Sequence, residues 1–141
     1  MTTPNPETVL LAEDLAKVYY LRPSDHPGLL LVSTAFDGSG FGSWKRAMTI
    51  ALSTKSKLYF VDASLTRPAH TSRDLKKWTK CNDMVVSWIL NVLSKNIADS
   101  IIHAKSARQM WVELEECFGQ INGAKLYHVK KKICTVNQRH G

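Results

Sequence analysis

The sequence is poor in the features that build disulfide frameworks, membrane spans or secretion signals. It has three cysteines, Cys81, Cys117 and Cys134, an odd number without a C-x-x-C spacing, which excludes a disulfide framework and indicates a reducing compartment. No run of 18 apolar residues occurs, so no membrane span is expected. The N-terminal MTTPNPETVLLAEDLAK carries acids and no basic region, unlike a secretory signal. We therefore expect a cytoplasmic protein.

The sequence also lacks the motifs of common catalytic and metal sites. No H-E-x-x-H, G-x-S-x-G or carboxylate pair occurs, and the five histidines are far apart. The glycine-rich stretch 36–44 is not followed by G-K-[ST], which disfavours a nucleotide loop. Cys134 and His140 are close in sequence but lie near the chain end, where a nucleophile is disfavoured. We expect no enzyme activity, no metal, no cofactor and no small-molecule substrate.

Acidic residues are absent beyond Glu116, although the chain carries a net charge of +7. Five cations follow without a carboxylate to offset them, and such a basic stretch indicates an acidic partner, nucleic acid first. The alternative is a solvated helix face with no partner. The candidate nucleic-acid contacts are Lys125, Lys130, Lys131, Lys132 and Arg139.

What the sequence does contain is a strongly apolar segment in its middle, residues 78–93. Trp78, Cys81, Val85, Trp88 and Val92 follow one another at spacings of three and four, which places them on one stripe of an α-helix. Val86, Leu90 and Leu93 form a second stripe, so the helix is apolar around most of its circumference. Such a helix is normally surrounded by other elements, and we predict a central helix over residues 75–93.

Shorter periodic segments on both sides predict further helices around the central one. We expect helices near residues 43–54, 95–102, 106–118 and 123–136. Ser39 or Ser43 is a candidate cap for the first, Asp74 for the central helix, and Ser106 with Gln109 forms a capping box. The fold class is thus all-α, a small bundle of about 4–6 short helices. The predicted core residues are Trp44, Met48, Trp78, Val85, Trp88, Val92, Met110, Trp111, Leu114 and Phe118.

Three segments lie outside the helices predicted for the bundle, two at the chain ends and one inside the domain. Residues 1–18 form a flexible arm or a short helix opened by Pro6, and residues 29–33 suit an irregular or short extended segment. The domain itself is expected over residues 19–136, with residues 137–141 as a frayed terminus. Lys76, Lys77 and Lys80 would sit at the N-terminal end of the central helix, where the macrodipole disfavours cations. This placement suggests another use for them.

Three phrases of the chain belong together: YYLRPSDHPGLLLVSTAFDGSGFGSWKRAMTIALSTKSKL, WTKCNDMVVSWILNVLSKNIADSI and MWVELEECFGQINGAKLYHVKKKI. In this order they resemble the N-terminal Gag region of copia-type LTR retrotransposons. Their order and separations match the family pattern from about Tyr19 to about Val136. The chain departs from it at Gly40-Phe41, where the family usually has Asn-Tyr, so the aromatic packing should survive while the local cap is in doubt.

The resemblance implies a capsid-like helical segment that self-associates weakly as part of a virus-like particle around RNA. It also implies a truncated polyprotein, since the zinc knuckle, protease, integrase and reverse transcriptase signatures of the family are absent. A fragment, a degenerate element and a domesticated host gene are all compatible with this. Two other functions stay open: a sequence-nonspecific RNA-binding module acting through the basic C-terminal helix, and an adaptor for a host protein.

Overall fold

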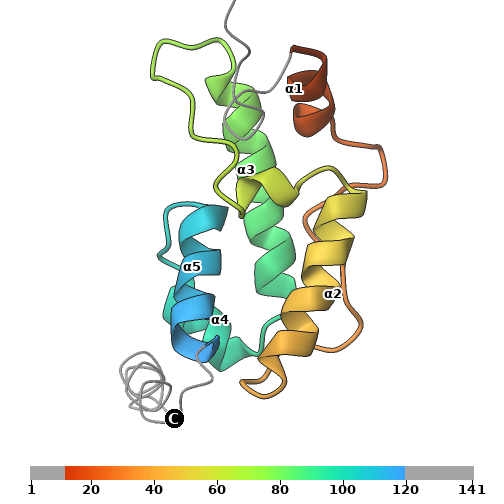
Figure 1. Cartoon of the computed structure of the whole chain (residues 1–141), viewed down its shortest axis with the longest axis vertical. Coiled ribbons are helices and arrows are strands. Elements are labelled where there is room, and N and C mark those ends of the chain that lie inside the picture. The colour runs from red at the N-terminus through yellow and green to blue at the C-terminus, as the bar shows by residue number, and fades with distance from the viewer. Residues whose placement is uncertain (1–11, 120–141) are drawn as a thin grey trace, which may run out of the picture.

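The computed structural model describes residues 12–119, and within them it consists of short helices joined by loops (Figure 1). Phe36 and Leu93 form an isolated parallel bridge, and no longer strand occurs among these residues. The prediction of a small all-α bundle is therefore confirmed for the described part. The elements are α1 (Ala12–Tyr19), α2 (Phe41–Thr54), the 3-10 helix η1 (Leu58–Phe60), α3 (Leu75–Asn91), α4 (Lys95–Ile101) and α5 (Ala107–Phe118).

Helix α3 runs lengthwise through the bundle, as the apolar segment predicts (Figure 1). Its buried stripe contains Trp78, Cys81, Val85 and Trp88. The helix ends two residues earlier than predicted because the chain turns at Val92 to meet Phe36. The Phe36 N–H donates to the Val92 carbonyl at 2.8 Å, and the N–H of Ser94 donates to the Phe36 carbonyl at 2.8 Å. This exchange of backbone bonds separates α3 from α4.

Helices α2 and α5 flank α3, and an aromatic cluster closes the end of the bundle where α2 begins. Phe36 packs edge-on against Phe118 with ring centroids 4.8 Å apart, and Trp44 lies 5.8 Å from Trp111. Phe41 joins them at 5.5 Å from Phe36, so the aromatic position of the family pattern packs here. Phe118 is partly buried against the core. The other predicted core residues are buried: Trp44, Met48, Trp78, Val85, Trp88, Val92, Met110, Trp111 and Leu114.

The helix starts follow the predicted caps only in part. The Ser106 hydroxyl accepts from the Gln109 N–H at 3.1 Å, while the Gln109 side chain accepts from the N–H of Lys105. Neither Ser39 nor Ser43 caps α2, whose N-cap is Gly40 with a left-handed φ of 69°. That prediction was wrong, because a turn that needs positive φ precedes the helix and glycine adopts it at little cost.

Two other helices begin without a side-chain cap, although Asp74 was predicted to cap one of them. Asp74 is the N-cap residue of α3, but its side chain makes no capping hydrogen bond. Its own N–H donates to the Ser72 hydroxyl at 3.1 Å, so the turn before the helix is held by Ser72 instead. Ser94 precedes α4 in an extended conformation and also lacks a side-chain cap. The starts of α3 and α4 are therefore not fixed by the side chains of their N-cap residues.

The predicted N-terminal boundary of the domain, residue 19, coincides with the last residue of α1 (Ala12–Tyr19). Residues 12–19 are helical, the α1 side chain Val18 is only 1% exposed, and α1 packs against α3. The predicted arm, residues 1–18, therefore overlaps a packed helix, whereas residues 1–11 lie outside the described part. The predicted helix 123–136 and the terminus 137–141 lie outside it as well. Among residues 12–119, no helix is both long enough and apolar enough to span a membrane.

Candidate functional site

The five cations proposed for nucleic-acid contact all lie in the C-terminal stretch that the structure does not describe. Their role therefore stays a prediction, and the charged surfaces that the structure does describe lie within residues 12–119. These cations are Lys125, Lys130, Lys131, Lys132 and Arg139.

Positive charge in the described part of the chain is concentrated in residues 67–80. Residues 12–119 contain fourteen lysines and arginines and eleven aspartates and glutamates, a net charge of +3. The stretch 67–80 alone holds five of these cations and one aspartate, a net charge of +4. The rest of the described chain is thus slightly acidic, and this short stretch dominates the positive field.

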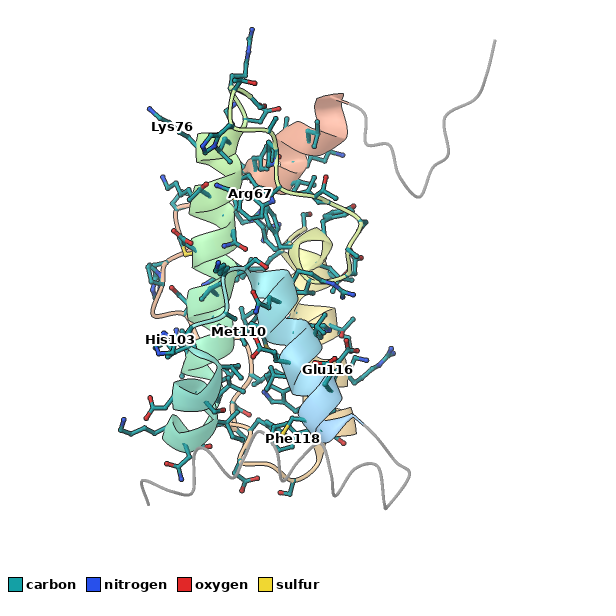
Figure 2. The ribbon with its side chains drawn as sticks, turned by 90° about the vertical axis from the view of Figure 1, so that its left-hand side faces the viewer. Arg67, Lys76, His103, Met110, Glu116 and Phe118 are labelled. Carbon is teal, nitrogen blue, oxygen red and sulfur yellow. The ribbon has the colours of Figure 1, made fainter. Side chains whose placement is uncertain are left out.

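Three of these cations, Lys76, Lys77 and Lys80, are exposed on the first two turns of α3. Figure 2 shows Lys76 pointing away from the bundle. The salt bridges among the described residues involve none of the three. A cation at a helix N-terminus opposes the macrodipole, at about 0.3–1 kcal/mol. These lysines therefore add charge to the surface without stabilising the helix that carries them.

A groove of about 620 Å³ opens between the loop after η1, the N-terminal half of α3 and the start of α5. We call it the cationic groove, because three cations and one carboxylate line it: Arg67, Lys105, Arg108 and Asp83. Phe60, Leu65 and Trp78 contribute apolar lining, and Thr66, Thr79, Asn82 and Ser106 contribute polar groups. A surface of this composition fits an anionic partner that also carries apolar groups.

The two arginines of the cationic groove are held in place by the groove itself. The Arg67 guanidinium lies over the Trp78 ring, 6.0 Å from its centroid, which is a cation–π geometry. Arg108 Nη1 donates to the Val61 carbonyl at 2.6 Å. Lys105 is exposed and its ammonium takes part in no salt bridge within residues 12–119. Two of the three cations are therefore pre-organised, and Asp83 is the one carboxylate that lines the groove with them among residues 12–119.

Two unfavourable features lie beside these cations. The Trp78 Nε1 is buried and has no hydrogen-bond partner among the described residues, at a typical cost of about 1–3 kcal/mol. Ala63, which also lines the groove, has a φ of 72°, a left-handed conformation that costs a residue with a Cβ about 1–3 kcal/mol. Such features persist where surrounding structure imposes them, and they are enriched at functional sites.

A second polar cluster, the turn 22–29, also packs against α3, and several of its groups are paired. Asp25 accepts from Lys55 Nζ at 2.7 Å and from the Arg22 N–H at 2.9 Å. Burial by itself raises the pKa of Asp25, but these hydrogen bonds and the Lys55 charge hold that pKa below its ordinary value. Trp88 Nε1 donates to the His26 carbonyl at 2.8 Å. This cluster is structural, since its groups bind one another.

A buried lysine and a buried thiol lie between that turn and α3. Lys57 is 1% exposed, and its Nζ donates to the Tyr20 carbonyl at 2.6 Å and to the Lys55 carbonyl at 3.3 Å. Burial lowers the pKa of Lys57. Burial raises the pKa of the Cys81 thiol, whose Sγ donates to the Tyr19 carbonyl at 3.3 Å. A neutral, bonded thiol of this kind is a core group rather than a nucleophile.

The described residues do not contain a set of side chains that could bind a metal ion. Within residues 12–119 no three histidine, cysteine, aspartate or glutamate side chains lie close enough to hold a metal ion. The cationic groove could not be predicted from the sequence, because the cations that line it are up to 41 residues apart, from Arg67 to Arg108. The charge of Lys76, Lys77 and Lys80 at the start of α3 indicated the neighbouring stretch 67–80, but these three lysines do not line the groove.

Comparison with known proteins identifies one family. Residues 22–69 match the Gag-polypeptide of LTR copia-type, a range that includes the turn 22–29, α2 and η1. No curated protein and no solved structure matches the chain. The resemblance to copia-type Gag is thereby confirmed over residues 22–69, and it supports a retrotransposon Gag-like role for the chain.

Proposed function

On the premise of the copia-type Gag match, we propose that the chain is a structural, non-enzymatic module that self-associates in the cytoplasm during assembly of a virus-like particle. The observation that carries this proposal is a set of large apolar side chains left in solvent by a bundle that otherwise packs well. Leu30 is 63% exposed, Tyr20 is 59% exposed, and Ile50 and Ile102 are each 49% exposed. A second copy that covers these side chains removes their apolar surface from water, which is favourable.

The second apolar stripe of α3 supports the same proposal. Val86 and Leu90 are only partly buried, whereas Val85 and Ile89 on the adjacent face are completely buried. The bundle therefore covers one side of its most apolar helix better than the other. A second copy is the partner that Gag-type assembly provides for such a surface.

Light scattering coupled to size-exclusion chromatography tests this proposal. We expect the mean mass to rise with protein concentration at moderate salt, and to stay closer to the monomer when Leu30 and Ile102 are both changed to Ser. Chemical denaturation serves as the control, because substitution of exposed side chains should leave the free energy of unfolding within about 0.5 kcal/mol. A strictly monomeric wild type at high concentration would contradict self-association.

A second candidate function is sequence-nonspecific RNA binding through the C-terminal cations, which the uncompensated charge beyond Glu116 favours. If three to five of them contact phosphates, the slope of log affinity against log salt on single strands should be about −2 to −3.5. Changing Lys130, Lys131 and Lys132 to Gln should make this slope shallower. The control variant is Lys95→Gln, which removes one charge from an α4 ion pair with Asp99. Equal slopes for the triple variant and the wild type would exclude this stretch as the contact.

A further inference from the structure

The described part of the molecule carries opposite charges towards its two ends. Arg67 and Lys76 lie near the N-terminal end of α3, whereas Glu116 lies on the last turns of α5, towards the other end of the long axis (Figure 2). We call residues 67–80 with the cationic groove the basic end, and the last turns of α5 the acidic end.

The acidic end holds three glutamates within four residues of α5. Glu115 pairs with Lys45 at 2.6 Å, while Glu116 is exposed and forms no salt bridge within residues 12–119. Glu113 Oε2 is buried without a hydrogen-bond partner among the described residues. Burial raises the pKa of Glu113, and the neighbouring charge of Glu116 raises it further. Glu113 and Glu116 therefore have no salt-bridge partner among residues 12–119.

Both sets of charges sit at the helix end where they are least stable. Lys76 and Lys77 lie at the positive end of the α3 macrodipole, and Glu115 and Glu116 lie at the negative end of that of α5. Each side-chain charge reinforces the partial charge of its helix end instead of neutralising it. The monomer carries this cost, and an opposite charge supplied from outside relieves it at both ends.

We propose that the basic end of one molecule binds the acidic end of a second copy, with the last turns of α5 seated at the cationic groove. The proposal rests on the proposed self-association and names its electrostatic surfaces. Because the two contacting surfaces differ, the contact is heterologous, and repeating it produces open chains or rings rather than closed dimers.

The groove chemistry favours a protein partner over nucleic acid here. Single-stranded nucleic acids bind through exposed aromatic platforms, but the Trp78 ring is only 7% exposed and Arg67 already covers it. Carboxylates on the last turns of α5 match the cations of the groove in charge. The chain itself thus contains an acidic partner that the groove fits.

A charge-swap experiment on the full chain tests the proposal. The basic-end variant carries Lys76→Glu, Lys80→Glu and Lys105→Glu, and the acidic-end variant carries Glu113→Lys and Glu116→Lys. Most of these changes place a charge where the helix dipole prefers it, so both variants should fold, which thermal unfolding checks. Association is measured by light scattering at about 0.05 M and about 0.5 M salt, where screening differs strongly.

We expect each variant alone to associate at least tenfold more weakly than the wild type at low salt, and an equimolar mixture of the two to recover mixed complexes. High salt should weaken wild-type association, and the control Lys95→Glu should associate as the wild type does. Unchanged association of both variants, or a mixture that fails to recover, overturns the charged contact while self-association stands. A basic-end variant that loses only RNA binding also overturns it. A wild type that is monomeric at both salts overturns the proposed function as well.

Discussion

Two loops pack against α3 from different sides, and they differ in whether the polar groups beside them have hydrogen-bond partners. The turn 22–29 accepts hydrogen bonds from two α3 side chains: Trp88 Nε1 donates to the His26 carbonyl, and Asn91 Nδ2 donates to the Pro27 carbonyl. The loop 61–73 leaves the Trp78 Nε1 without a partner among residues 12–119 and brings uncompensated arginine and lysine charges to its groove.

This difference indicates which of the two surfaces can gain hydrogen bonds or ion pairs when a partner binds. A turn whose charges and carbonyls are already paired gains little from an outside ligand, because binding would exchange one satisfied bond for another. A groove with unpaired cations and a strained residue gains much more from such a partner. The turn 22–29 therefore builds the fold, and the groove, whose lining from Phe60 to Arg67 also lies within the Gag match, is the better candidate for a contact.

The largest expected loss of stability follows the removal of Trp88, the tryptophan whose indole N–H is hydrogen-bonded. Trp88 is fully buried, so Trp88→Ala should lower the free energy of unfolding by about 3–5 kcal/mol. Urea denaturation followed by circular dichroism measures this loss. A loss below 1 kcal/mol would show that Trp88 is not part of the core.

A matched pair of substitutions isolates the hydrogen bond from the packing. Trp88→Phe and Trp78→Phe remove the same atoms from two buried sites, but only the first breaks a bond, the one to the His26 carbonyl. We expect Trp88→Phe to cost about 1–3 kcal/mol more than Trp78→Phe, because it leaves a carbonyl unsatisfied. Equal losses in denaturation experiments would contradict the contrast between the two loops.

The pairing of Asp25 with Lys55 in the turn 22–29 should make the free energy of unfolding depend on pH in the acidic range. Because the pKa of Asp25 is lowered in the folded protein, its contribution is fully present above the ordinary carboxyl pKa of about 3.9. The contribution is lost as the pH falls through the lowered value. Unfolding free energies measured from about pH 5 downwards should fall, and Asp25→Asn should flatten that fall. An identical pH profile in the variant would show that Asp25 is not the titrating group.

The smallest expected effect concerns the unpaired lysines. Lys76→Gln with Lys77→Gln should raise the free energy of unfolding by about 0.3–1 kcal/mol, since it removes two cations from the positive end of the α3 dipole. Lys95→Gln, which breaks an exposed i,i+4 pair, is the control and should lower stability slightly. A loss of stability on changing Lys76 and Lys77 would mean that both have partners in solution.

Prediction from the sequence was best where the signal was local and periodic. The spacing of Trp78, Cys81, Val85 and Trp88 predicted the buried face of α3, and the Ser106 cap predicted the start of α5. It was weaker at helix ends decided by distant contacts. The predicted extension of α3 to residue 93 did not anticipate the bridge between Leu93 and Phe36.

By itself, the sequence determined the helical class, the central helix and the resemblance to copia-type Gag, because hydrophobic period and motif order are properties of neighbouring residues. Only the tertiary structure decided which charges are paired and which are free. Lys55 finds Asp25 30 residues away, and Trp88 finds His26 62 residues away. Lys105 and Arg67 meet at a groove without a carboxylate for each cation. Ion pairs depend on distances in space, and chain spacing does not report these once a helix and two loops separate the partners.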